Sequence, residues 1–178
     1  MENVREKIEK EGINEFINSL FEKYKPTNTN ELFNVFKDMA DPLANDLNEA
    51  IDNDWKDTND KIKRHMYISI GMTLMPIVCK SQILIGITIA ILVINLYFGI
   101  RLYFNTKTRV VYFQANAHNI AMLNLNSILN KFIYENVNLQ PDEEVSDEVF
   151  DKYFGKNSCE EFIDICSNYF LNSIGWEK

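Results

Sequence analysis

Small and polar residues inside a long apolar region are the first candidates for function in this sequence of 178 residues. Five of them lie within residues 81–100, a stretch without a charged side chain: Gly86, Thr88, Ala90, Asn95 and Gly99. Gly86 and Ala90 are four residues apart, as are Asn95 and Gly99, so each pair lies on one side of a helix. Small residues let helices approach closely, and Thr or Asn can hydrogen-bond across the contact. The pattern predicts either a polar pathway through an oligomer, lined by Thr88 and Asn95, or a packing surface between two helices of one chain.

Basic residues flank the apolar region that contains this stretch. They are Lys61, Lys63 and Arg64 before it and Arg101, Lys107 and Arg109 after it. Lys80 stands alone between the two groups. Cytoplasmic segments next to a membrane are enriched in lysine and arginine. We therefore expect the six flanking residues to lie at a membrane interface.

The remaining reactive side chains do not form a recognisable catalytic or metal-binding motif. Closely spaced acids lie at Asp52, Asp54, Asp57 and Asp60, but the EF-hand glycine and terminal glutamate are missing, so a solvated helix face is expected. The only histidines are His65 and His118, and the three cysteines have no C-x-x-C spacing. There is also no P-loop, nucleophile elbow or dinucleotide fingerprint. We expect neither an enzyme nor a metal or cofactor site.

The apolar region that must position these residues covers 66–104, where 39 residues carry two charges. As a helix, residues 81–100 would span about 30 Å, the thickness of a hydrocarbon core. The uncharged run at 66–79 has only 14 residues, which is short for a crossing and leaves a single span possible. A buried central helix of a soluble bundle is the third alternative.

Two crossings agree best with the distribution of charge. Helices at about 62–79 and 83–104, joined near Lys80, put six basic residues on one side of the membrane and one on the other. A single crossing would leave basic residues on both sides. We expect a transmembrane hairpin in the cell inner (plasma) membrane, with both termini cytoplasmic.

Helical periodicity and capping residues predict helices on both sides of the hairpin, and hence an all-α integral membrane protein with cytoplasmic helical flanks. The region 1–61 is expected to contain an amphipathic helix at 2–24, a short helix after Asn30, and a stalk at 42–61 that begins at Asp41–Pro42. After the hairpin, an amphipathic helix is expected at 105–139. The last region, 140–178, is an acidic subdomain with helices at 142–154 and after Ser158.

The net charge is −8, and neither flank clusters lysine and arginine on one face. Both observations argue against a nucleic-acid-binding surface. Residues 141–178 carry ten acids and three bases. This acidic subdomain could pack on the other helices or bind a regulatory protein or signalling ligand on the cytoplasmic side.

The order of elements resembles that of a known family. A helix with a basic end (DTNDKIKRHMYISI) enters the hairpin, which leaves through LYFGIRLYFN into TKTRVVYFQANAHNIAMLNLNSILNKFI. Over residues 43–135 this looks like the two-transmembrane SLATT group found beside bacterial nucleotide-signalling systems. The resemblance implies a membrane-damaging or channel-forming effector in anti-phage defence, and it implies no catalytic residues.

Two functions are therefore expected as alternatives. In the first, the chain is a homo-oligomeric membrane effector, a gated pore or membrane-disrupting protein controlled by its cytoplasmic domain. In the second, it is a membrane-anchored adaptor or assembly subunit that places a protein-binding helical domain at the bilayer.

Overall fold

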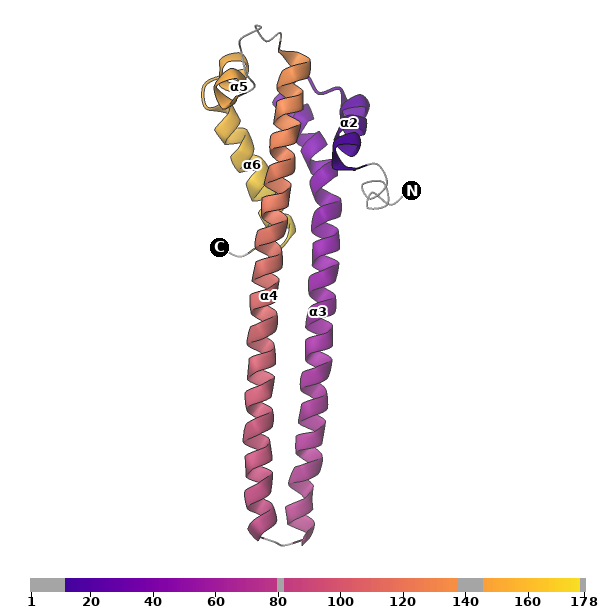
Figure 1. Ribbon diagram of the computed structural model, residues 1–178, viewed down its shortest axis with the longest axis vertical. Helices are drawn as coiled ribbons and strands as arrows, with labels where there is room; N and C mark the ends of the chain where they lie inside the picture. Colours follow the sequence, from indigo (N-terminus) through magenta and orange to yellow (C-terminus); the bar gives the residue numbers. More distant parts are fainter. Residues whose placement is uncertain (1–11, 80–81, 138–145, 177–178) are drawn as a thin grey trace. The chain divides into compact units, whose positions relative to one another are not determined.

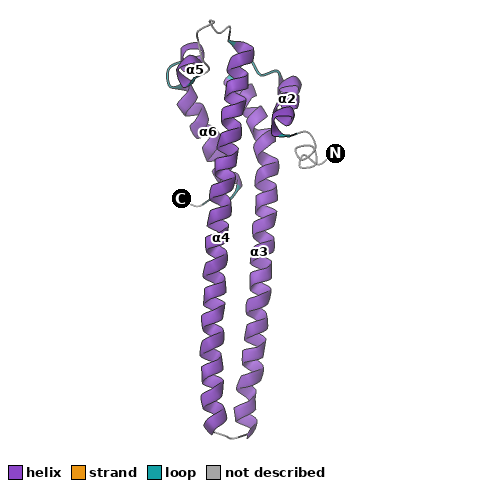
Figure 2. Ribbon diagram, in the orientation of Figure 1, coloured by secondary structure: helices purple, strands orange, loops and turns teal. Residues whose placement is uncertain are grey.

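The computed structural model describes residues 12–79, 82–137 and 146–176, and leaves the side chains of 73–79, 82 and 84 undescribed. The described residues form helices and no strand (Figures 1 and 2), so the expected all-α class is confirmed. The helices are α2 (Ile13–Tyr24), α3 (Thr29–Cys79), α4 (Gln82–Asn136), α5 (Asp147–Phe154) and α6 (Ser158–Ser173). The expected hairpin turn near Lys80 falls on 80–81, outside the described residues, as do the first part of the expected helix at 2–24 and residues 142–145.

The chain divides into two compact units. The head unit consists of residues 1–48 and 114–178, and the hairpin unit consists of residues 49–113. Helices α3 and α4 each contribute residues to both units.

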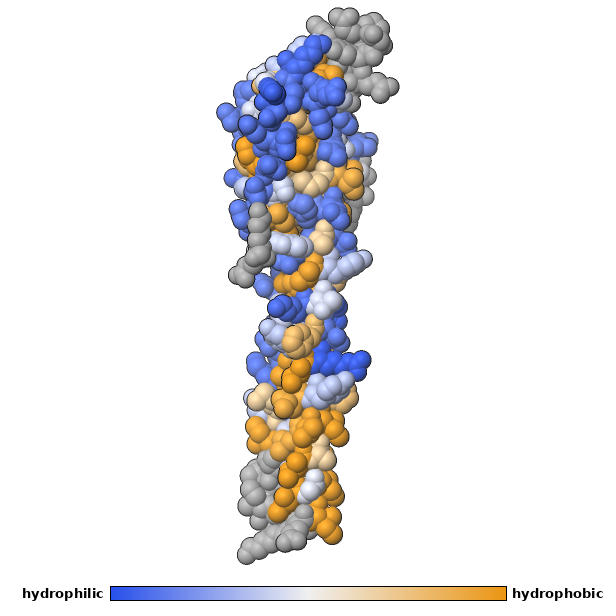
Figure 3. Space-filling model, turned by 90° about the vertical axis from the view of Figure 1, so that its left-hand side faces the viewer, coloured by the Kyte–Doolittle hydropathy of each residue, from blue (hydrophilic) through white to orange (hydrophobic). Residues whose placement is uncertain are grey.

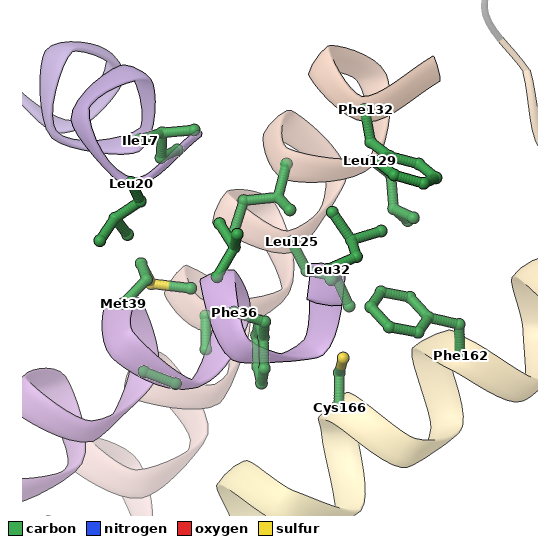
Figure 4. Close-up of a cluster of buried hydrophobic side chains, with 14 of the residues drawn as sticks. Ile17, Leu20, Leu32, Phe36, Met39, Leu125, Leu129, Phe132, Phe162 and Cys166 are labelled. Atoms are coloured by element: carbon green, nitrogen blue, oxygen red, sulfur yellow. The ribbon is translucent and has the colours of Figure 1, made fainter. Parts of the chain in front are cut away.

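The head unit has a dense hydrophobic core made by five helical segments. Figure 4 shows Phe36 of α3, Leu125 and Phe132 of α4, and Phe162 of α6 pointing into one cluster. Phe36 and Phe132 are completely buried, and Phe150 of α5 packs its ring 6.1 Å from that of Phe132. Burial of such side chains is the main source of stability for this unit.

The expected break at Asp41–Pro42 is wrong, because α3 continues through both residues. Pro42 lacks the N–H that would bond the carbonyl of residue 38, which costs a helix about 3 kcal/mol. Core packing of Met39 and Ala44 on either side holds the helix together, since both are buried. Asp41 is not a helix cap and instead accepts a hydrogen bond from the hydroxyl of Tyr169 on α6.

Two helix starts are capped by other residues than expected. At α3 the cap is Asn28 and not Asn30, because Asn28 Oδ1 accepts from the Glu31 N–H at 3.0 Å. The Glu31 carboxylate accepts in return from the N–H of Thr27 at 2.8 Å, an arrangement close to a capping box.

At α6 the cap comes from a different helix. Asp151 of α5 accepts from the backbone N–H groups of Asn157 and Cys159, both at 2.9 Å, and from the hydroxyl of Ser158. Ser158 is therefore a donor to this carboxylate and does not cap the helix as expected. The expected end of α5 at residue 154 is confirmed, and the next residue, Gly155, has a φ of 115° that a side chain would strain.

Within the hairpin unit, α3 and α4 run antiparallel and side by side (Figure 1). Contacts at three levels define the register: Asp54 with Arg109, Thr58 with Thr106, and His65 with Asn95. The sum of the two residue numbers stays between 160 and 164 at these contacts. The two helices therefore remain paired along the described part of the unit.

Candidate site in the hairpin unit

The hairpin unit buries polar side chains and exposes apolar ones, the reverse of the head unit. Among the described residues, every buried hydrophobic side chain belongs to the head unit. The buried side chains among the described residues of the hairpin unit are Thr58, Ser69, Thr88 and Thr106, with exposed fractions of 2, 7, 8 and 1%. Of the 25 exposed large hydrophobic side chains among the described residues, 20 lie in this unit, and Figure 3 shows hydrophobic residues gathered on the visible face toward the lower end of the view. Water does not favour such a surface, whereas lipid does.

The buried hydroxyl groups are hydrogen-bonded inside the unit. Thr58 Oγ1 and Thr106 Oγ1 are 2.7 Å apart across the two helices. On α4, Thr88 Oγ1 donates to the backbone carbonyl of Met72 on α3 over 3.4 Å. These contacts link the helices at two well-separated levels.

A histidine and an asparagine meet between these two levels. His65 Nδ1 lies 3.3 Å from Oδ1 of Asn95, and both side chains are half-buried. One turn further along α3, Ser69 Oγ donates to the carbonyl of His65 over 2.9 Å. Thr58 and His65 are seven residues apart, as are Thr88 and Asn95, so each helix presents its polar residues along a heptad seam. We call this set of contacts the polar seam.

A groove opens from the polar seam to the outer surface of the hairpin unit. Its volume is about 550 Å³, and its polar lining comes from His65, Ser69 and Asn95. The rest of the lining is apolar or aromatic and includes Ile62, Met66, Ile70, Leu92, Leu96 and Tyr103. Gly99 also lines the groove, and a Cβ added there would meet no atom within 4 Å. The groove can therefore hold an apolar chain against a few hydrogen-bonding groups.

The five small and polar candidates separate into two groups. Thr88, Asn95 and Gly99 lie at the polar seam or the groove. Gly86 and Ala90 are exposed, and a Cβ added to Gly86 would meet no atom within 4 Å. The close helix approach predicted for Gly86 therefore has no partner among the described residues of the same chain.

The six basic candidates also differ in their contacts. Arg109 holds Asp54 with two hydrogen bonds, of 3.1 and 2.7 Å, and Lys61 pairs with Asp57 at 2.5 Å. The other four are exposed and form no ion pair with a residue that the structure describes: Lys63, Arg64, Arg101 and Lys107. Their charges remain available to an external anion.

The sequence analysis gave His65 no role in helix pairing and did not name Ser69 or Thr106. The seven-residue step from Thr58 to His65 and the four-residue step to Ser69 form a signal that could have identified the seam, because heptad positions of paired helices face each other. The aromatic pair at one end of the groove, Trp55 and Tyr103 with ring centres 5.4 Å apart, follows from the same register.

The remaining reactive groups of the described residues serve packing. No cluster of three or more His, Cys, Asp or Glu side chains that could hold a metal ion occurs among them. Burial raises the pKa of Cys159 and of Cys166 to about 12, so both are neutral thiols at physiological pH. His118 Nε2 lies 2.9 Å from Ser167 Oγ and joins α4 to α6.

The described residues form an all-α protein with a hydrophobic core in the head unit and a paired-helix unit that exposes apolar surface. Among the described residues, α4 is the one helix that is long and apolar enough to cross a membrane. Most side chains at the apolar end of α3, those of residues 73–79, are not described by the structure. No family model, curated protein or solved structure matches the chain.

Proposed function

We propose that the hairpin unit inserts into the inner membrane and that both termini remain in the cytoplasm. The observation that carries the proposal is the reversed burial of this unit, with threonine, serine, histidine and asparagine between the helices and large apolar side chains outside. In a bilayer, polar side chains are stable where they bond to each other, and apolar ones face lipid.

The length of the apolar surface differs between the two helices. From Arg64 to Cys79, α3 rises about 22 Å, roughly 8 Å less than the hydrocarbon thickness. The adjacent lysine and arginine side chains would extend toward the headgroups, or the bilayer would thin around the hairpin. A hairpin that thins the bilayer is suited to a membrane-disrupting activity.

We further propose that the protein is an oligomeric membrane effector, a gated pore or membrane-disrupting protein controlled by its head unit. Two features support this. Gly86 and Ala90 are exposed, and a Cβ added to Gly86 would meet no described atom within 4 Å, so both are available to a second copy. Asn95 reaches the outer surface through the groove, where it can line a polar path. The resemblance of residues 43–135 to the SLATT group implies anti-phage defence as the setting, with a regulatory protein or signalling ligand acting on the cytoplasmic side.

Membrane potential in growing cells tests the effector proposal. Cells that make the wild-type chain, with its neighbouring genes active, should depolarise and stop growing. Asn95→Leu should reduce depolarisation while the protein still reaches the membrane. The pore would lose polar contacts with water and ions at this position, and an apolar constriction can exclude water and block conduction. Ile94→Leu is the matched control, since Ile94 is exposed and apolar. An unchanged potential in wild-type cells would contradict the proposal.

One observation favours the adaptor as a second candidate. Among the described residues, no buried side-chain nitrogen or oxygen lacks a hydrogen-bond partner. The buried hydroxyl groups of the polar seam are thus satisfied within one chain and need no oligomer. An adaptor should keep its activity when an unrelated two-helix anchor replaces residues 62–104, whereas an effector should lose it.

A further inference from the structure

We propose that the groove of the hairpin unit is a binding site for one anionic phospholipid, with an acyl chain along the groove and the phosphate at its cytoplasmic end. This inference rests on the proposed membrane insertion. It assigns a ligand to the apolar lining of the groove, which the effector and adaptor functions leave unexplained.

The apolar length of the groove matches an acyl chain. The lining side chains of α3 and α4 leave a space of about 550 Å³ that is open along one side. Gly99 keeps this space deep, because a larger residue would fill it. An extended hydrocarbon chain can enter from the bilayer and lie against both helices.

Charge at one end of the groove matches an anionic headgroup. Lys63 lies on the same face of α3 as Met66 and Ile70, three and seven residues later, and both line the groove. Lys107 lies one turn beyond the lining residues Tyr103 and Phe104 of α4. Both lysines are exposed and form no ion pair with a described residue, so an external phosphate is free to bind them.

The antiparallel arrangement brings the two ammonium groups toward one level. Helical side chains incline toward the N-terminus of their own helix. Lys63 therefore inclines toward residue 59, and Lys107 toward residue 103. The observed register pairs these positions, because Thr58 meets Thr106 and the Trp55 ring packs 5.4 Å from the Tyr103 ring.

Asn95 adds a hydrogen-bond donor deeper in the groove. Its Oδ1 faces His65, while its amide nitrogen has no partner among the described residues. An amide nitrogen donates two hydrogen bonds, and the ester carbonyls of a phospholipid accept them. Asn95 lies two helical turns from Tyr103, about 12 Å along α4, on the acyl-chain side of the phosphate position.

Quenching of Trp55 fluorescence by brominated phospholipids tests the site. The full chain with Trp176→Phe retains Trp55 as its single tryptophan. It would be reconstituted into vesicles of unlabelled phosphatidylcholine with a small fraction of acyl-brominated phosphatidylglycerol or acyl-brominated phosphatidylcholine. We expect the phosphatidylglycerol to be preferred, by roughly fivefold for each lysine that contacts the phosphate.

Two double variants with equal charge separate a site from general attraction. Lys63→Gln with Lys107→Gln should reduce the preference to about one, and Gly99→Leu should weaken quenching by both lipids. Arg64→Gln with Arg101→Gln is the control, because the residues one turn from these arginines toward the membrane, such as Ile68 and Tyr97, do not line the groove.

Four results would overturn the proposal. The first is equal quenching by both lipids, and the second is an equal loss of preference in the two double variants. The third is a Leu96→Cys disulfide dimer that forms regardless of phosphatidylglycerol, because a second copy would then cover the groove. The fourth is quenching by neither lipid, and flotation of the vesicles would then show whether membrane insertion fails as well.

Discussion

The hydroxyl pair of Thr58 and Thr106 permits a quantitative test of the polar seam. Thr106→Val retains the shape of the side chain but leaves the Thr58 hydroxyl buried, at 2% exposure, without its partner 2.7 Å away. An unpaired buried hydroxyl costs about 1–3 kcal/mol. For a chain of this size, each kcal/mol lowers the melting temperature by about 2–4 °C. We expect Thr106→Val to lower it by roughly 2–12 °C.

The two single variants should differ in a defined direction. After Thr58→Val, the Thr106 hydroxyl still accepts from Arg109 Nη2 at 3.2 Å, so the cost should be smaller. The double variant removes both hydroxyl groups and should be more stable than Thr106→Val alone, because no unpaired group remains. The resulting coupling energy should be about 1–2 kcal/mol.

Thermal unfolding in detergent, followed by helical circular dichroism, would measure the cycle. Hydrogen exchange of the backbone amides around residues 58 and 106 would locate the effect in the hairpin unit. Additive losses in the double variant would refute the reasoning, because the hydroxyl groups would then act independently.

Three further predictions concern the head unit and the outer face of α4. Partial burial raises the pKa of Asp38, but hydrogen bonds from Lys23 and Tyr24 outweigh it and lower the pKa below the usual 3.8. This carboxylate therefore stabilises the head unit above about pH 4, and the stabilisation is lost as the pH falls through the lowered value. In denaturant titrations Asp38→Asn should be less stable than wild type by about 1 kcal/mol near pH 6 and nearly as stable as wild type near pH 2. A stability difference that is the same at both pH values would contradict this role of the Asp38 carboxylate. Cys159 and Cys166, with pKa values raised to about 12, should resist iodoacetamide at about pH 8 until the head unit unfolds, as mass spectrometry of the modified peptides would reveal; rapid labelling of the folded chain would disprove their burial. Gly86→Leu should shift the oligomer toward smaller species in detergent if Gly86 contacts a second copy. Light scattering would measure the mass of the oligomer, with Ile87→Leu as the control. An unchanged mass would show that Gly86 is not part of the interface.

Local periodicity in the sequence was sufficient for the helical class and for several helix ends. The end of α5 before Gly155 could be predicted because a glycine with positive φ ends a helix through local geometry alone. The apolar stretch within residues 81–100 likewise identifies α4 as a potential membrane helix, since length and composition are sequence properties.

The environment of each polar residue required the tertiary structure. Whether Asn95 faces lipid, another chain or α3 depends on the register of two helices, and the structure places its Oδ1 3.3 Å from His65. The continuation of α3 through Pro42 depends on packing by Met39 and Ala44, and the cap of α6 comes from Asp151 on another helix. Such partners are distant in sequence or in a different helix, so no local pattern records them. The sequence alone therefore determined which segments are helical and apolar, while the pairing of α3 with α4 decided which side chains form the seam and which line the groove.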